Sequence, residues 1–194
     1  MTVIRETPDI QAIKALIQSF FDRINDSDAK GLGKLFIANA NLTIIRQDPA
    51  RDPPSDSPWS LLSLPHNAAT ICHDAQEKEK LTIVLRTSIE NFVKIIEDGE
   101  KRRDPTKPAP KVHEAPDLEA TDVKVDHLFG AAWSPFRVTF DGVLHHYGTF
   151  AFTFGKVDDG SGKLWRLEGL TQNYRRTKGW GEPGEPGELA KGNL

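Results

Sequence analysis

His146 lies in an alternating stretch with several phenylalanines and is the first side chain that we expect to do chemistry. Residues 144 to 154 read LHHYGTFAFTF, so every second side chain of this predicted strand shares a face. His146 falls on the face of Phe150 and Phe152, whereas His145 falls on the opposite face, at solvent or at a dimer surface. An imidazole beside apolar walls can act as a general acid or base near neutral pH. The alternative is a core histidine that is hydrogen-bonded to a neighbouring strand.

Two polar residues on the last predicted strand, Thr171 and Asn173, share the phase of Trp165 and Leu167. If Trp165 and Leu167 pack inward, Thr171 and Asn173 line the open end of the sheet. There they could orient a substrate or stabilise an enolate oxygen. We therefore predict that both residues belong to the site of His146.

Asp22 and Arg46 are the charged candidates. Asp22 lies between Phe21 and Ile24 on the first predicted helix, so it is either a buried acid of raised pKa that carries a second proton or a solvated helix residue. Arg46 ends the first predicted strand and is either a binder of an anionic substrate group or an exposed strand-end arginine. The expected walls of the pocket are Phe20, Trp133, Phe136, Phe150 and Phe152.

These side chains must be positioned by a long antiparallel meander from 133 to 176. Asp141-Gly142 and the run 158 to 162, DDGSG, are turn signals between β-rich runs, and Asp-Gly in such a place predicts a hairpin. One face of this meander is rich in phenylalanine and needs an apolar cover. Apolar residues from 10 to 24 recur at helical spacing after Asp9, a predicted N-cap, and supply part of that cover.

The remaining elements complete a fold prediction. We expect a short second helix capped by Ser27 or Asp28, strands over 40–46 and 80–86, and a third helix that follows the capping-box sequence Thr87-Ser88-Ile89-Glu90. Four antiparallel strands follow. Helices on one face of such a sheet make an α+β domain, in which a strongly curved, mainly antiparallel sheet wraps around three N-terminal helices as a cone. The cavity of that cone is the expected binding site.

Three segments depart from regular structure. Proline is dense over 48–65 and 100–116, which predicts two long loops. Residues 178–194 repeat Gly-Glu-Pro and offer little core material, so we predict a flexible tail after a single domain over 1–177.

Composition narrows the function classes. A net charge of −3 gives no reason to expect nucleic acid or an anionic membrane as partner, and no apolar run reaches the length of a membrane span. The start of the chain lacks the apolar core of a signal peptide, and the single cysteine, Cys72, fits a reducing compartment, so we expect a cytoplasmic protein.

The sequence contains no motif for a metal or a cofactor. The spacing of His113, Glu114 and His127 is not that of metal ligands, and no phosphate loop is present, so we expect neither metal nor cofactor.

Several stretches together resemble a known superfamily. The helical pair with FFDRINDSDAKGLGKLF, the strand ANLTII, the helix SIENFVKII and the closing meander look like the nuclear-transport-factor-2-like, or SnoaL-like, fold. The Trp-x-Pro-aromatic, His-x-Gly and Trp-x-aliphatic patterns of the meander are similar to the lumazine-binding-like SnoaL subgroup. Scytalone dehydratase and ketosteroid isomerase are distant relatives on this scaffold. The resemblance covers roughly residues 8 to 177.

The resemblance implies roles as well as a fold. Scytalone dehydratase-like members place a histidine on the penultimate strand and a hydroxyl residue and an Asn, two apart, on the last strand, which His146, Thr171 and Asn173 match. Those members also use a Tyr-Asp pair late in the first helix, whereas this chain has Phe21-Asp22 and lacks the phenol.

Two functions follow. The first is a cofactor-independent isomerase, dehydratase or cyclase that acts on a small apolar metabolite, such as a polyketide- or terpenoid-like ring. The second is a non-catalytic small-molecule-binding module, or a dimeric interaction module that forms a homodimer through the outer sheet face.

Overall fold

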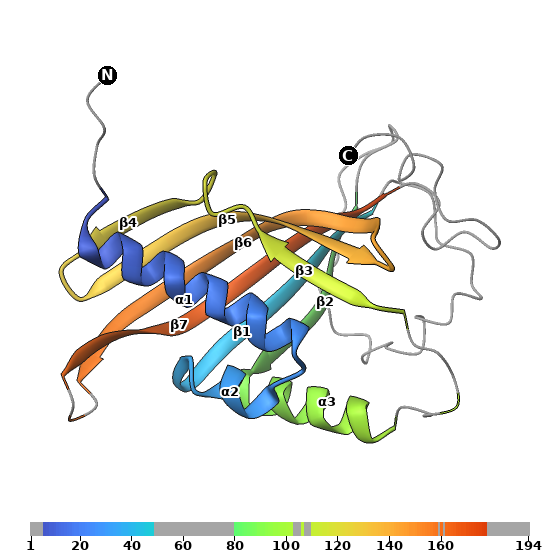
Figure 1. The fold of residues 1–194 in the computed structure, drawn as a ribbon, viewed down its shortest axis with the longest axis horizontal. Coiled ribbons are helices and arrows are strands. Elements are labelled where there is room, and N and C mark those ends of the chain that lie inside the picture. Colours follow the sequence, from blue (N-terminus) through green and yellow to red (C-terminus); the bar gives the residue numbers. More distant parts are fainter. Residues whose placement is uncertain are drawn as a thin grey trace.

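The structure, a computed structural model, describes residues 6–48, 80–102, 106, 110–158, 160 and 162–177. Within them three helices and seven strands follow one another as α1 (Pro8–Asn25), α2 (Ala29–Gly33), β1 (Phe36–Asp48), β2 (Lys80–Ser88), α3 (Ile89–Lys101), β3 (Val112–Pro116), β4 (Asp122–Asp126), β5 (Phe129–Phe140), β6 (Val143–Asp158) and β7 (Lys163–Arg176). The strands form one curved sheet, and the helices lie on one side of it (Figure 1). The predicted α+β cone is confirmed.

The sheet has the strand order β2-β1-β7-β6-β5-β3, and β4 pairs with the other half of β5. All pairs are antiparallel except β1 with β7, which is parallel. The β5–β6 hairpin turns at Asp141 and Gly142, whose φ angles are +50° and +81°. Positive φ at both central residues matches the right-handed twist of the strands, so the predicted hairpin forms there.

Helix α1 is capped two residues earlier than its sequence indicates. Thr7, not Asp9, is the N-cap, and its hydroxyl accepts a hydrogen bond of 3.4 Å from the Ile10 amide. Pro8 follows in the first turn, where its missing N–H costs no helical hydrogen bond. The Asp9 carboxylate instead accepts from Lys156 Nζ at 2.6 Å and from Trp165 Nε1 at 3.0 Å, and thereby ties α1 to the ends of β6 and β7.

The core is a cluster of aromatic rings between α1 and the inner face of the sheet. Phe20 and Phe21 of α1 are buried and meet Phe150 edge-on at centroid distances of 5.6 and 5.3 Å. Phe150 and Phe152 stack along β6 at 5.1 Å. Such edge-on and offset arrangements contribute beyond the area that the rings bury. The face of β6 that its alternation predicts is therefore the face that α1 covers.

Other predictions differ from the structure. Residues 112–116, expected in a loop, form β3, because their backbone pairs with β5 from Phe136 to Phe140. Strand β1 begins at Phe36 rather than 40. Asp28 caps α2 as predicted, whereas Ser88 rather than Thr87 accepts from the first turn of α3. Residues 49–65, Cys72 and the segment 178–194 lie outside the described residues.

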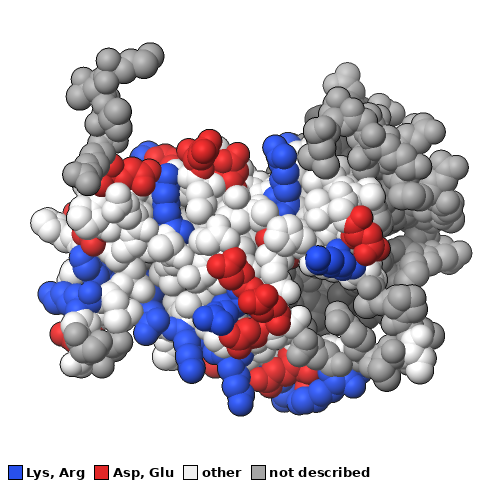
Figure 2. Space-filling view, viewed as in Figure 1, with Lys and Arg blue, Asp and Glu red and all other residues white. Residues whose placement is uncertain are grey.

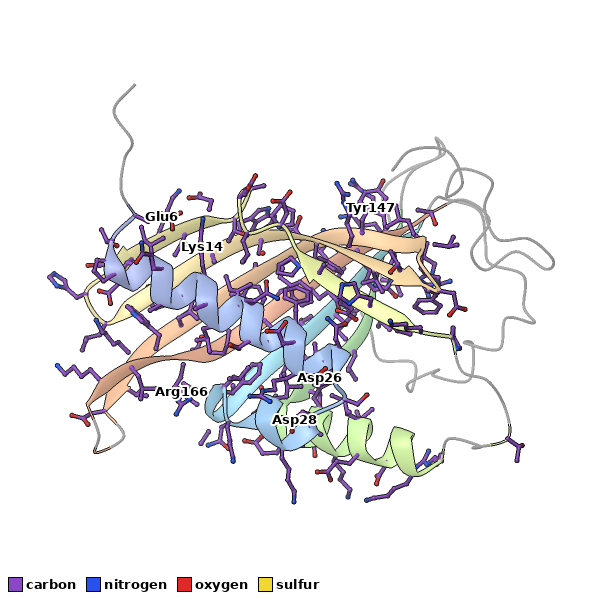
Figure 3. The ribbon with its side chains drawn as sticks, viewed as in Figure 1. Glu6, Lys14, Asp26, Asp28, Tyr147 and Arg166 are labelled. Carbon is purple, nitrogen blue, oxygen red and sulfur yellow. The ribbon has the colours of Figure 1, made fainter. Side chains whose placement is uncertain are left out.

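The surface around α1 carries both signs of charge. Lysine and arginine side chains alternate with aspartate and glutamate over this face (Figure 2). Glu6 and Lys14 form an ion pair of 2.7 Å at the start of α1, and Asp26 and Asp28 lie where α1 passes into α2 (Figure 3). None of the helices in the described part of the chain is long and apolar enough to cross a membrane.

Candidate functional site

A cavity of about 210 Å³ lies between the inner face of the sheet and helices α1 and α3. Its walls come from α1, β1, α3, β3, β6 and β7 and are formed by Phe20, Ile24, Leu42, Ile44, Phe92, Ile96, Glu114, Phe150, Leu170 and Gln172. Eight of these ten side chains are apolar, so the two polar ones, Glu114 and Gln172, decide what chemistry the cavity can perform. This cavity is the candidate functional site.

Glu114 is held in place through its backbone. Asn25, the last residue of α1, donates from Nδ2 to the Glu114 carbonyl and accepts from the Glu114 amide, both at 2.7 Å. This pair of bonds joins the end of α1 to the middle of β3. Glu114 lies opposite Val138 in the sheet register, and Val138 is fully buried, so the two side chains share the inner face.

The carboxyl of Glu114 is surrounded by protein. Burial raises the pKa of Glu114 to about 7, because the apolar walls solvate the carboxylate poorly. No hydrogen bond or ion pair from another described residue reaches this carboxyl. It is therefore divided between its neutral and charged forms near neutral pH, and a general acid or base is most effective in that state.

Gln172 supplies the second polar group of the cavity. It is 9% exposed and lies directly opposite Phe150 in the register of β6 and β7. Its side-chain amide has both an N–H donor and a C=O acceptor. No described residue bonds to that amide, so both functions can face a ligand.

A β-bulge in β7 explains why Gln172 lines the cavity and Thr171 and Asn173 do not. Phe154 pairs with Leu167, but Thr153 pairs with Gly169, so Glu168 is an extra residue in β7. One extra residue exchanges the two faces of the strand beyond it. The predicted inward positions of Thr171 and Asn173 are therefore wrong: both lie on the outer face, and Asn173 Oδ1 accepts from Gln47 Nε2 at 3.0 Å.

His146 lies on the inner face, as predicted, but outside the walls of the cavity. It is opposite Val138 on one side and Arg176 on the other, and its ring is 4.7 Å from that of Tyr174. Burial, the adjacent His145 and the charge of Arg176 lower the pKa of His146 to about 3. At neutral pH this imidazole is uncharged.

The alternation of β6 predicted that His145 lies at solvent or at a dimer surface, but in the structure it is half-buried. The pairing of β5 with β6 shifts between Val138 and Thr139, so His145 is the extra residue of a second bulge. Its ring stacks on Phe140 at 4.2 Å, and its Nδ1 is 2.7 Å from Nδ1 of His146. Burial, followed by the charge of Arg176, lowers the pKa of His145 to about 4.

Asp22 is a solvated helix residue, the second of its two sequence alternatives. It is exposed and accepts a hydrogen bond of 2.8 Å from Gln18 one turn earlier. With Asp26 and His113 it lines a polar hollow of about 590 Å³ at the end of α1, which is separate from the apolar cavity. The structure does not bring Asp22 together with His146.

The predicted pocket walls divide into three groups. Phe20 and Phe150 line the cavity, and Phe136 and Phe152 lie in the aromatic core behind it. Trp133 is 58% exposed on the outer sheet face, opposite Ala151, and does not reach the cavity. Arg46 of β1 pairs with Tyr174 of β7. It lies on the inner face, two residues after the cavity residue Ile44, and is not one of the wall residues.

Glu114 and Gln172 are the site residues that the sequence did not reveal. Glu114 lies between two prolines in a stretch that is typical of a loop, and only its pairing with β5 makes it a strand residue. Gln172 could not be predicted because the bulge at Glu168 exchanges the two faces of β7 beyond it. Among the described residues no three His, Cys, Asp or Glu side chains come together to hold a metal ion.

Comparisons with known proteins find structural similarity without sequence similarity. The chain matches no family model and no curated protein. An NTF2-like protein from Cytophaga hutchinsonii has 9% identity and a TM-score of 0.52, over 88% of this chain and 100% of that one. This chain has the NTF2-like fold.

Two further solved structures are similar to this chain. A beta subunit described as part of an aromatic-ring-hydroxylating dioxygenase, from Novosphingobium aromaticivorans, is 12% identical with a TM-score of 0.57, over 87% of this chain and 90% of that one. A protein of unknown function with a cystatin-like fold, from Nostoc punctiforme, is 8% identical with a TM-score of 0.51, over 91% and 97%. The NTF2-like cone accounts for a ligand-sized cavity between helices and sheet.

Proposed function

We propose that this protein is a cofactor-independent isomerase, dehydratase or cyclase that acts on a small apolar metabolite in the cone cavity. The observation that carries the proposal is Glu114, a carboxyl whose pKa is raised to about 7 inside a cavity with otherwise mainly apolar walls. A carboxyl in this state can remove a proton from carbon and return it at neutral pH. Glu114 takes the acid and base role that we predicted for His146 and Asp22.

The simplest reaction that fits these groups is enolisation of a carbonyl compound. The Glu114 carboxylate takes a proton from the carbon next to the carbonyl, and the electron pair moves to the carbonyl oxygen. The side-chain N–H of Gln172 donates to that oxygen as negative charge develops there. Return of the proton from the neutral Glu114 to the same carbon gives exchange alone. If the ketone is β,γ-unsaturated, the enolate is a dienolate, and delivery of the proton to its γ carbon moves the double bond into conjugation and completes an isomerisation. Loss of a β-hydroxyl from the same enolate, with Glu114 as the acid, gives a dehydration.

The cavity limits the size and polarity of the substrate. An apolar cavity of about 150 Å³ in another protein accommodates benzene. A volume of about 210 Å³ therefore suits a single ring with one or two small substituents. Apart from Glu114, none of its wall residues is ionisable, so the part of the substrate that enters the cavity is uncharged.

The test compares Glu114→Gln with the wild type. A panel of monocyclic ketones is incubated with each protein in D₂O, and proton NMR measures hydrogen exchange at the carbon next to the carbonyl. Glutamine keeps the size of the side chain but cannot carry the proton, so exchange should fall at least about 100-fold. Ligand binding, followed as line broadening, should persist.

Asp22→Asn is the matched control, because it neutralises a carboxylate of the same protein outside the cavity and should leave exchange unchanged. Exchange that persists in the Glu114→Gln protein would remove Glu114 from the reaction. If no ketone of the panel binds or exchanges, the proposed reaction is wrong.

A second candidate function is a dimeric interaction module. The outer sheet face exposes 58% of Trp133 and 44% of Tyr147, and Tyr147 projects away from α1 (Figure 3). Arg137 lies opposite Tyr147 on the same face, and Thr139 and Thr149 follow along β5 and β6. An isologous contact through this face gives a homodimer. Light scattering at micromolar concentration tests it: a dimer that Trp133→Glu converts to a monomer supports the proposal, and a wild-type monomer contradicts it.

A further inference from the structure

Asn25 closes the edge of the sheet at the residue that carries the candidate acid. β3 is the last strand in the order of the described sheet, and it runs beside α1 (Figure 1). In an antiparallel pair, successive residues direct their backbone N–H and C=O groups alternately toward the partner strand and away from it. The backbone groups of Glu114 point away from β5, because Asn25 bonds both of them.

The Asn25 side chain takes the place of a neighbouring strand at this point. A carboxamide has the same C=O acceptor and N–H donor as a peptide group. Nδ2 of Asn25 donates to the Glu114 carbonyl and Oδ1 accepts from the Glu114 amide, both at 2.7 Å. Two bonds to one residue fix its backbone and therefore the point from which its side chain starts. The Glu114 carboxyl is thereby held in place relative to Gln172, the other polar group of the cavity.

The same contact separates two spaces of opposite polarity. Ile24 and Glu114 line the apolar cavity, whereas their chain neighbours Asn25 and His113 line the polar hollow. A polar space of about 590 Å³ has ample room for water. The hydrogen bonds between Asn25 and Glu114 therefore lie between a space that suits water and a space that suits apolar groups.

The charged side chains around Glu114 lie outside the cavity. Those that line the polar hollow are Asp22, Arg23, Asp26, Lys111 and His113. The cavity walls from β1, α3, β6 and β7 hold no ionisable residue, and Arg46, His146, Tyr174 and Arg176 lie on the inner face beyond the cavity. Burial, and not a neighbouring charge, raises the pKa of Glu114. That pKa therefore reports how much water reaches the carboxyl.

We propose that Asn25 is a positioning residue for Glu114: its amide holds the carboxyl at the cavity wall and keeps the water of the polar hollow away from it. The inference rests on the proposed function, in which Glu114 is the acid and base. Asn25 bonds only the backbone of Glu114 and lines no part of the cavity, so its loss should affect turnover more than substrate binding.

The first measurement is the pKa of Glu114 in the full chain. Carbon-13 NMR follows the side-chain carboxyl carbons of glutamate in the wild type and in Asn25→Ala, and Glu114→Gln identifies the Glu114 signal by its loss. Alanine removes both hydrogen bonds and opens the contact to water, which favours the charged carboxylate. The pKa of Glu114 should therefore fall from about 7 by at least about one unit.

The second measurement is hydrogen exchange in D₂O of the ketone that the wild type exchanges fastest, over a range of ketone concentration and pH. In Asn25→Ala, kcat should fall about tenfold or more while KM changes less than about threefold, because the base is misplaced but the apolar walls remain. The pH at which the rate rises should move down together with the pKa of Glu114.

Asp9→Ala is the matched control on the same helix. It removes two tertiary hydrogen bonds at the other end of α1, those from Lys156 and Trp165, and Asp9 lines neither space. This variant should lose thermal stability, as Asn25→Ala does, but keep the wild-type kcat and the wild-type pKa of Glu114. Asn25→Asp keeps the acceptor and loses the donor, so it serves if the alanine variant fails to fold, and it should also lower kcat.

The outcomes separate this inference from the proposed reaction. An unchanged pKa of Glu114 in Asn25→Ala, or an equal loss of kcat in the variants at 9 and 25, overturns the role of Asn25. If the wild type exchanges no ketone, the proposed reaction is wrong, and the pKa of Glu114 in Asn25→Ala still decides whether Asn25 keeps water from the carboxyl.

Discussion

Gln172 of β7 lies directly opposite Phe150 of β6, and both line the apolar cavity. This pairing exists because Glu168 is an extra residue in β7, so that the strand presents Trp165 and Leu167 inward before the bulge and Leu170 and Gln172 inward after it. The bulge thereby decides which polar group of the last strand meets a ligand.

The first prediction tests that face assignment with the same incoming residue at neighbouring positions. Leu170→Asn places an amide at a site that is 6% exposed and removes a buried apolar side chain, so it should lower the free energy of unfolding by about 3 kcal/mol or more. Thr171→Asn changes the outer face and should cost about 1 kcal/mol or less. Urea denaturation of both proteins measures the difference. A larger cost at Thr171 would reverse the assignment.

The second prediction concerns the pH dependence that Glu114 confers. The folded pKa of Glu114, about 7, is above its ordinary value of 4.5, so the folded state binds more protons than the unfolded state between these values. The contribution of this carboxyl to stability is thus present at pH 4.5 and below and is lost as the pH rises through 7. Glu114→Gln should be stabilised relative to the wild type by about 2 kcal/mol more at pH 8 than at pH 5. Urea denaturation at the two pH values provides the measurement, and a pH-independent difference would show that the carboxyl is not desolvated.

The third prediction concerns acid stability and the histidine pair. The folded pKa values of His145 and His146, about 4 and about 3, are below the ordinary histidine value of 6.5, so the unfolded state binds more protons between pH 6.5 and pH 3. Their contribution to stability is present above pH 6.5 and is lost as the pH falls through this range. Because Glu114 acts in the opposite direction over part of the range, the comparison is made in the Glu114→Gln background. There, His146→Asn should reduce the loss of stability between pH 7 and pH 4.5; the same loss in both proteins would contradict the lowered pKa.

The fourth prediction explains the glycine in the His-x-Gly motif. A Cβ atom on Gly148 would lie 1.9 Å from the Asn173 carbonyl oxygen and 2.7 Å from the Tyr174 Cα, which are backbone atoms of the paired strand. Gly148→Ala should therefore lower the free energy of unfolding by about 2 kcal/mol or more. Gly155→Ala on the same strand meets nothing within 4 Å and should be neutral or slightly stabilising. Thermal unfolding of the two variants tests the contrast, and equal melting temperatures would be the contrary result.

Elements whose signal is local could be predicted from the sequence alone. The apolar stripe of α1, the alternation of β6 and the Asp141-Gly142 turn each depend on side chains a few residues apart. The inner position of His146 followed from the same alternation, since no bulge lies between it and Phe150. These features led to the cone fold.

The side chains that enter the cavity could not be predicted in this way, because they depend on contacts between distant parts of the chain. Glu114 becomes a buried acid because a proline-flanked segment pairs with β5 and is held by Asn25, which is 89 residues away in the chain. Gln172 replaces Thr171 and Asn173 because one extra residue is accommodated between β6 and β7, and the cost of a bulge depends on both strands and on the rings packed beneath them. Periodicity is a property of one strand, whereas register and desolvation are properties of the neighbours that a strand finds.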